Sequence, residues 1–263
     1  MTNLEKLMYS TIRLQSDNST ATGFIFSFNI GNEVVDTIIT NRHFAQQVKD
    51  GIIDYSLMEQ DQYITINMHT NDDSFITFSL KVRWYLHPHE DLCFCFLKPV
   101  LEKFKFFKKK YKISFLDERS FANDLEIKKM QPIERILMIG YPNGMYDEYH
   151  NLPICRNGYT ASSPKLNFNN EPKVLVDIAA YPGSSGSPVF ISLDDSKAGY
   201  IEKPLLVGVL SQAVLRPQRI VSTETGEDIS SIIALSESYL GLYIKIEKIL
   251  DFKDTIKAKK GHY

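Results

Sequence analysis

Pro182-Gly183-Ser184-Ser185-Gly186-Ser187-Pro188 is a turn of small residues placed between two strand-like runs. A nucleophilic serine on such a turn can present its hydroxyl to solvent. Gly183 frees the flanking backbone to aim its N–H groups at one point, where they would hold a developing oxyanion. The same string also fits a flexible loop, so a catalytic interpretation depends on residues elsewhere in the chain.

A histidine and an aspartate upstream supply that support. His43 directly follows the apolar strand-like run Ile38-Ile39-Thr40-Asn41-Arg42 and stands at the start of a short helix expected over residues 44–48. Asp91 heads the apolar segment 92–97, where its carboxylate could accept an imidazole N–H, orient the ring and stabilise its protonated form. Each residue alone is more commonly a surface or capping residue, and only the combination indicates catalysis.

Short runs of β-branched and aromatic residues with alternating polarity recur along the chain, separated by polar or Gly/Pro/Asn turns. This pattern is typical of strands, and many short strands close into antiparallel barrels or sandwiches because closure removes exposed edges. We expect strands at residues 22–28, 34–40, 63–68, 74–82 and 92–97 in the first half, and at 133–140, 157–162, 173–178, 188–191, 205–211 and 241–246 in the second.

The alternation lapses between the two halves, where lysines and aromatic residues crowd together around residues 103–112. We interpret residues 1–100 as one lobe, residues 101–132 as a linker, and residues 133–263 as a second lobe that includes a helix or tail at its end. The lysine-rich stretch is either a solvated linker whose aromatics pack on the lobes or a docking surface for an acidic partner.

Composition and charge restrict the classes of partner. The 263 residues carry a net charge of −2 with opposite charges well mixed, which gives no electrostatic reason to expect nucleic acid or a membrane surface. No apolar stretch approaches the roughly 20 residues that cross a bilayer, and the N-terminus lacks the pattern of a secretory signal. Cys93 and Cys95 share a face of one extended segment and do not easily bridge. We therefore expect reduced thiols and a cytoplasmic location.

Four segments together resemble the trypsin-like peptidases, especially the bacterial HtrA/Deg proteases and the V8-type glutamyl endopeptidases. Ile39-Thr40-Asn41-Arg42-His43 resembles the family's Leu-Thr-Asn-x-His block, and Asp91-Leu92 its Asp-Leu/Ile-Ala block. Gly140-Tyr141-Pro142 is similar to the Gly-Tyr/Asn-Pro that opens the second barrel. Residues 177–188 resemble the Asp-Ala-Ala-x-x-Pro-Gly-Asn-Ser-Gly-Gly-Pro run that carries the nucleophile.

The resemblance implies an all-β fold of two antiparallel β-barrels of the chymotrypsin type, with the active site in the cleft between them and a short C-terminal helix. It implies a serine endopeptidase that uses no metal and no other cofactor. Ser185 would attack the scissile carbonyl, His43 would take and return the proton, and Asp91 would support the histidine. The amides of Gly183 and Ser185 would form the oxyanion hole. Residues 205–211 resemble the strand that binds substrate backbone by β-addition.

Two departures from the digestive members of the family concern activation and specificity. Ser184 replaces the aspartate that pairs with a newly cleaved N-terminal amine, so activation by N-terminal clipping is not expected. Ala179 replaces the aspartate that selects Arg or Lys, and Ala180, Ser211 and Ala213 would line the same pocket. A pocket without charge cannot compensate a buried cation, so we expect a small or medium apolar residue before the cut.

The expected substrates are proteins or peptides. We expect neither a zymogen switch nor a PDZ domain, so activity would need another means of control. We expect an activating protein partner that orders the loop around residues 181–185, because a few kcal/mol shift such an equilibrium almost completely. A regulated protease in bacterial stress or defence fits this expectation.

Three other interpretations compete with the serine peptidase. His87-Pro88-His89-Glu90-Asp91 fits most of the His-x-His-x-Asp-His motif of metallo-β-lactamase-like hydrolases, although Leu92 replaces the last histidine. A catalytically silent protease-like fold could serve as a peptide-binding or scaffold module. Cys155 as a thiol nucleophile is the weakest alternative, because it has no histidine in the expected turn context.

Overall fold

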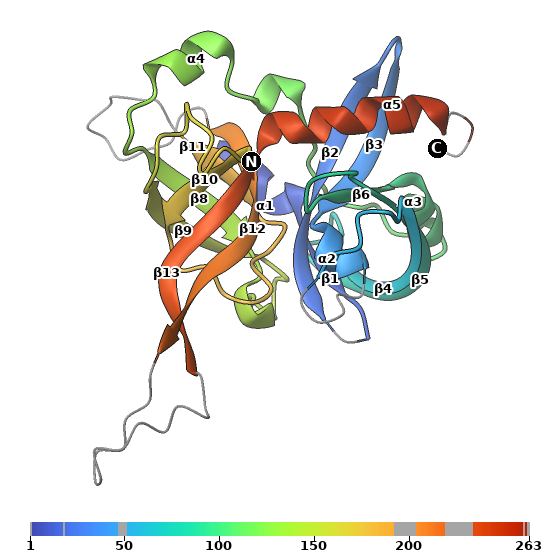
Figure 1. The fold of residues 1–263 in the computed structure, drawn as a ribbon. Helices are drawn as coiled ribbons and strands as arrows, with labels where there is room; N and C mark the ends of the chain where they lie inside the picture. The colour runs from blue at the N-terminus through green and yellow to red at the C-terminus, as the bar shows by residue number, and fades with distance from the viewer. Residues whose placement is uncertain are drawn as a thin grey trace, which may run out of the picture.

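The computed structural model describes residues 2–17, 19–46, 52–191, 204–218, 234–259 and 261. They form two six-stranded antiparallel β-barrels that lie side by side (Figure 1). The first barrel contains β1 (Thr11–Gln15), β2 (Thr20–Ile30), β3 (Glu33–Thr40), β4 (Glu59–His69), β5 (Phe75–Leu86) and β6 (Cys93–Phe96). The second contains β8 (Arg135–Gly140), β9 (Ile154–Thr160), β10 (Lys173–Asp177), β11 (Pro188–Ile191), β12 (Leu205–Gln218) and β13 (Ala234–Lys245).

The N-terminal barrel follows the order β1-β4-β5-β6-β3-β2 and closes through the pairing of β1 with β2. Strand β2 is buried on both faces. Ile25 points into the barrel interior, whereas Phe24, Phe26 and Phe28 belong to a second apolar cluster that also contains residues of the C-terminal barrel. Because successive side chains of a strand point to opposite faces, one strand can supply both cores. The continuous apolar run of β2 therefore joins the two barrels.

The C-terminal barrel is closed in the order β10-β13-β12-β11-β8-β9. Its interior is filled by apolar residues from these strands, among them Met138, Val176, Val189 and Tyr243. On the other face of the same strands, residues such as Ile139 and Val209 join the shared cluster with the N-terminal barrel. The two barrels thus have separate interiors and one common apolar seam.

The predicted all-β fold of two antiparallel barrels with a short C-terminal helix is confirmed, and the fold is chymotrypsin-like. Every strand expected from the sequence is present, with ends that differ by up to seven residues, as at the end of β12 and the start of β13. The strand β1, which directly follows the helix α1 (Asn3–Ser10), was not predicted. The short helix expected over residues 44–48 is α2 (Arg42–Ala45), and residue 48 lies outside the described residues.

The stretch between the barrels is more ordered than a plain linker. It contains α3 (Lys98–Lys105), β7 (Leu116–Asp117), which adds to β2, the 3-10 turn η1 (Glu118–Ser120) and α4 (Asp124–Lys129). Phe104 is buried, and Phe107 packs on Phe78 with ring centroids 5.5 Å apart. Lys112 pairs with Asp73. These contacts account for part of the lysine-rich stretch as packing on the N-terminal barrel.

The C-terminal segment crosses from one barrel to the other. After β13, the 3-10 helix η3 (Ile246–Asp251) and the helix α5 (Phe252–Ala258) lie across the N-terminal barrel, over β2 and β3 (Figure 1). The Phe252 ring lies 4.9 Å from that of Phe94 and 5.4 Å from that of His87. The end of the chain therefore fastens the C-terminal barrel to the barrel that carries His43 and Asp91.

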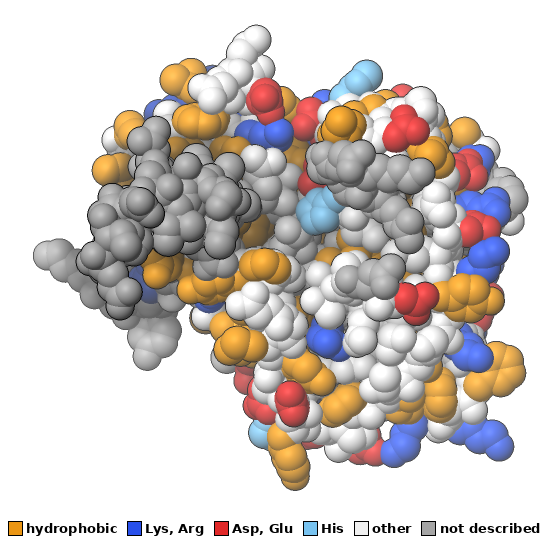
Figure 2. Space-filling model, turned by 60° about the horizontal axis from the view of Figure 1, so that its bottom comes forward, with side chains coloured by type: hydrophobic (Ala, Val, Ile, Leu, Met, Phe, Trp, Pro, Cys, Tyr) orange, Lys and Arg blue, Asp and Glu red, His pale blue; other side chains and the backbone are white. Residues whose placement is uncertain are grey.

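The surface of the molecule carries mixed charge. Figure 2 shows acidic and basic side chains side by side along one edge of the face in view, with hydrophobic side chains scattered over the rest. This distribution agrees with the small net charge of −2. Among the described parts of the chain, no helix has the length and apolar character needed to span a membrane.

Replacing Phe252 by alanine tests the crossing segment. The ring is 2% exposed, so Phe252→Ala should lower the free energy of unfolding by about 3–5 kcal/mol through lost burial and a residual cavity. Urea unfolding followed by circular dichroism measures the change. Lys257→Ala, on the exposed side of α5, is the matched control and should leave the midpoint almost unchanged. Equal midpoints for the two variants would contradict the fastening role of α5.

Candidate active site

Two hydrogen bonds join His43 to Asp91, and both residues belong to the N-terminal barrel. The Nδ1 atom of the imidazole lies 2.8 Å from Oδ2 of Asp91, and the backbone N–H of His43 donates to Oδ1 at 2.9 Å. The carboxylate is buried and the imidazole is half-buried, with 34% of its side-chain surface exposed. With Nδ1 directed at the carboxylate, Nε2 is the nitrogen left for a reacting group.

Local sequence explains why these two residues meet. His43 lies in the first turn of α2, which begins soon after β3, and Asp91 lies two residues before β6, which pairs with β3. Asn41 begins α2 and donates its side-chain amide to the Asp91 carbonyl at 2.7 Å instead of capping the helix. The Asn41 of the Thr-Asn-x-His block therefore ties the loop of the carboxylate to the strand that carries the base.

Arg42 and His87 hold the surrounding loops. The Arg42 side chain is fully buried and donates to the carbonyls of His87, Asp54 and Leu57. Nδ1 of His87 accepts the backbone N–H groups of residues 89 and 90, and its Nε2 lies 3.1 Å from the carboxylate of Asp251. This role of Arg42 was not predicted, although the residue lies inside the block that resembles the family motif.

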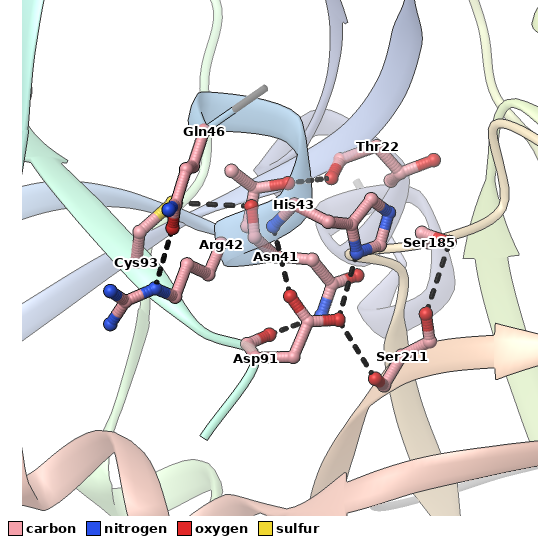
Figure 3. Close-up of polar contacts among 10 residues, drawn as sticks. Thr22, Asn41, Arg42, His43, Gln46, Asp91, Cys93, Ser185 and Ser211 are labelled. Carbon is pink, nitrogen blue, oxygen red and sulfur yellow. Dashed lines mark hydrogen bonds and ion pairs between the residues drawn. The ribbon is translucent and has the colours of Figure 1, made fainter. Parts of the chain in front are cut away.

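Ser211 connects the pair to the nucleophile turn. Its hydroxyl donates to Oδ2 of Asp91 at 3.0 Å, and its carbonyl accepts the Ser185 hydroxyl at 3.2 Å (Figure 3). The structure thus brings the predicted residues His43, Asp91, Ser185 and Ser211 into one hydrogen-bonded set. No hydrogen bond joins the His43 ring to the Ser185 hydroxyl among the described residues, because that hydroxyl is directed at Ser211.

The nucleophile turn is held by its own backbone and by two glycines. Gly183 and Gly186 have φ values of +83° and +85°, in the left-handed region that favours glycine. The N–H of Ser184 donates to the Tyr181 carbonyl at 2.9 Å, and that of Ser187 donates to the Ser184 carbonyl at 3.1 Å. The N–H groups of Gly183 and Ser185, predicted as oxyanion donors, donate to no other residue in the described parts of the chain.

Two opposed effects set the pKa of His43. Burial is the largest single effect and lowers the pKa, whereas the hydrogen bond from the imidazole to Asp91 and the charge of Asp91 raise it. Together the two contributions of Asp91 outweigh burial, so the pKa of His43 lies above the ordinary value of 6.5. A base tuned upward by a buried carboxylate accepts a proton more readily, as a general base must.

The residues predicted for the specificity pocket lie around the segment that leads into the turn. Ala180 is buried in the core of the C-terminal barrel, and Ala213 pairs with Gly241 across β12 and β13. A Cβ atom placed on Gly241 would lie 3.2 Å from that of Ala180, so these small residues are neighbours. Ala179 is half-buried.

Arg156 was not predicted and lies against this segment. Its guanidinium donates to the Ala179 carbonyl, and its Cζ lies 4.5 Å from the centroid of the Tyr181 ring. Arg156 therefore places a fixed positive charge beside the predicted pocket. Its position in β9 gave no sign of this, because only the folded barrel brings residues 156 and 179–181 together.

The strand expected to bind substrate backbone needs one correction. Residues 205–211 were expected to bind a substrate strand, but β11 pairs with β12 as far as Val209, and Leu210 exchanges backbone hydrogen bonds with Gly186 and Ser187. That edge is already occupied. In the described part of the chain, the same edge of β12 has no strand partner from Ser211 onward, so backbone addition is possible only there.

The metal-site alternative disagrees with the contacts of its residues. Both ring nitrogens of His87 are engaged, by backbone N–H groups and by Asp251, while Asp91 binds His43 and Ser211. These side chains do not converge on one point. The described residues also contain no group of three or more His, Cys, Asp and Glu side chains arranged to hold a metal ion.

The pKa of His43 provides a test of the pair that does not depend on activity. In an NMR titration, the wild-type ring should have a pKa above about 6.5. Asp91→Asn removes the charge that raises the pKa, so burial should then dominate and the pKa should fall below the wild-type value. The His43→Gln variant lacks this imidazole, so the resonance that disappears from its spectrum is that of His43. An unchanged pKa in Asp91→Asn would contradict the assigned cause.

The sequence matches a known family of protein domains. The model of the trypsin-like peptidase domain matches residues 21–196, which is more than half of the chain. Among solved structures, the Rv3671c protease of M. tuberculosis in an inactive form is similar, with 14% identity, a TM-score of 0.48, and coverage of 96% of this chain and 91% of that one. An inactive Ser-to-Ala mutant of Rv3671c from M. tuberculosis H37Rv gives 11% identity, a TM-score of 0.46, and coverage of 98% and 91%. No curated protein matches significantly. The chain belongs to the trypsin-like peptidase domain family.

Proposed function

We propose that this protein is a serine endopeptidase that hydrolyses peptide bonds through an acyl-enzyme on Ser185. The observation that carries the proposal is the hydrogen-bonded set in which His43 is bound to Asp91, Asp91 to Ser211, and Ser211 to Ser185. Membership of a peptidase family supports protein or peptide substrates. No step needs a metal or another cofactor.

The reaction uses each residue in one role. Ser185 rotates its hydroxyl to Nε2 of His43, transfers its proton there and forms a bond to the scissile carbonyl carbon. The resulting oxyanion is held by the N–H groups of Gly183 and Ser185, which have no other acceptor among the described residues. His43 then gives the proton to the amine as the scissile C–N bond breaks, which leaves the acyl group on Ser185. Water attacks the acyl carbon while His43 takes its proton, and His43 returns that proton to the Ser185 oxygen as the ester bond breaks.

The proposal also covers the cellular location and the regulation of the peptidase. We propose that it acts in the cytoplasm and that a protein partner activates it, in a bacterial stress or defence response. The observation that favours control is the direction of the Ser185 hydroxyl, which is bonded to Ser211 and not to His43. A partner or a substrate that moves this hydroxyl would complete the catalytic set.

The competing function is a silent peptide-binding module. Such a module needs the free edge of β12 but has no use for a histidine whose pKa a buried carboxylate raises. Perturbed groups of this kind concentrate at catalytic sites. We therefore favour the enzyme, and the two functions are separated by covalent labelling.

Labelling with a fluorophosphonate probe tests catalysis directly. The wild-type protein should be labelled at Ser185, and Ser185→Ala should lose the label. His43→Gln should lower the labelling rate by at least 10³-fold, because removing one triad member leaves little beyond the oxyanion hole and binding. Ser120→Ala, at a serine in the inter-barrel stretch, serves as the control and should label normally. The binding module would be favoured if the wild-type protein is not labelled, either alone or after addition of the proteins encoded by the neighbouring genes.

The cleavage preference provides a second test. An Arg or Lys side chain before the cleaved bond would bring its positive charge near the Arg156 guanidinium. The predicted pocket residues Ala179, Ala180 and Ala213 carry no negative charge that could compensate it. A peptide library should therefore show kcat/KM at least about 100-fold lower for Arg or Lys than for a small or medium apolar residue at that position. Preference for Arg or Lys would contradict this assignment of the pocket.

A further inference from the structure

Thr22 lies on β2 of the N-terminal barrel, is fully buried, and makes four hydrogen bonds. Its N–H donates to the Ser185 carbonyl at 3.0 Å, and its hydroxyl donates to the Gly183 carbonyl at 2.9 Å. The same hydroxyl accepts the N–H of Tyr141 at 2.9 Å, and the Thr22 carbonyl accepts the Thr40 hydroxyl at 2.7 Å. Three of these bonds cross from one barrel to the other.

The two carbonyls that Thr22 binds belong to the two residues whose N–H groups form the proposed oxyanion hole. The peptide unit between residues 183 and 184 is held at its carbonyl by Thr22 and at its N–H by the Tyr181 carbonyl. The unit between residues 185 and 186 is held at its carbonyl by Thr22 and at its N–H by the Leu210 carbonyl, 2.8 Å away. Each of these units is fixed at both ends.

The two peptide units that carry the oxyanion donors alternate with the fixed ones. Because the fixed units lie on either side of the Ser185 N–H and directly after Gly183, they determine where both N–H groups point. The N–H groups themselves stay unbonded among the described residues and are therefore available to an oxyanion. One residue of the opposite barrel thus holds the peptide units next to both donors, while the carbonyls of the donor units accept the N–H groups of Asn143 and Ser187.

Side-chain size makes this close approach possible. A Cβ atom on Gly186 would lie 1.9 Å from the Thr22 carbonyl oxygen, and one on Gly140 would lie 2.8 Å from the Thr22 hydroxyl oxygen. Glycines at both positions leave the space that Thr22 needs beside the turn. Valine has nearly the shape of threonine but can neither donate to Gly183 nor accept from Tyr141.

We propose that Thr22 is a positioning residue of the active site, which aligns the oxyanion donors of the C-terminal barrel with the His43–Asp91 pair of the N-terminal barrel. The inference rests on the proposed peptidase function but adds a residue that touches neither the substrate nor the reacting atoms. Its side-chain hydroxyl and its backbone N–H act together on one turn.

The test compares Thr22→Val with Thr22→Ser and Thr37→Val. Thr37 is an equally buried threonine whose hydroxyl donates to the Phe26 carbonyl at 2.8 Å, away from the turn. Thr22→Val should lower kcat by about 10- to 100-fold with KM within about threefold, because a displaced catalytic group loses rate more than ground-state binding. Thr22→Ser should recover most of the rate. Thr37→Val should keep the wild-type rate even if its stability falls.

Hydrogen exchange keeps the inference testable apart from activity. Thr22→Val should speed amide exchange in the peptide that spans residues 181–187, whereas Thr37→Val should not. Thr22→Ala replaces Thr22→Val if circular dichroism shows that the valine variant does not fold. Exchange equal to that of Thr37→Val, or an undiminished kcat, would overturn the role of Thr22. An inactive wild type whose exchange still depends on Thr22 would instead count against the peptidase function and leave Thr22 as the residue that holds the turn.

Discussion

The nucleophile turn lies in direct contact with the backbone of the opposite barrel, and this contact sets the conditions for the site. At Gly186 the approach is so close that even one methyl group would collide with the Thr22 carbonyl. The turn therefore needs glycine where it meets β2. The shared apolar seam, to which Phe24, Phe26 and residues of β8 and β12 contribute, holds the barrels at the distance that the turn requires. The distance between the two barrels therefore determines both the packing of the apolar seam and the geometry of the active site.

Asp91 illustrates how the structure accommodates a charge in that seam. A buried carboxylate is costly unless hydrogen bonds replace its water. Asp91 receives three donors: the backbone N–H and Nδ1 of His43, and the hydroxyl of Ser211. The first two come from the N-terminal barrel and the third from the C-terminal barrel. The carboxylate therefore has all three donors only when the two barrels are assembled, which links the orientation of the imidazole to the assembly of the fold.

The sequence predicted the strands, their grouping into two barrels and the order of the key residues, because alternation and short motifs are local properties. It failed where the reason is three-dimensional. Ile12 and Leu14 of β1 are buried, but the strand is only five residues long and follows a helix without a turn signal. Arg156 reads as one polar residue of a strand until the fold brings Ala179 to it. In the same way, nothing in a strand sequence distinguishes Thr22 from other strand threonines.

The resting position of Ser185 follows from the same network. Its hydroxyl donates to the Ser211 carbonyl at 3.2 Å, longer than the usual O–H···O range, so the bond contributes about 0.5–1.5 kcal/mol at most. That carbonyl stands where the edge of β12 becomes free for a substrate backbone. A substrate N–H that binds the Ser211 carbonyl would compete with the serine for the same acceptor. In the proposed reaction, substrate binding therefore frees the Ser185 hydroxyl to turn toward His43. The Ser211 carbonyl accepts the serine hydroxyl in the free enzyme and the substrate N–H in the complex.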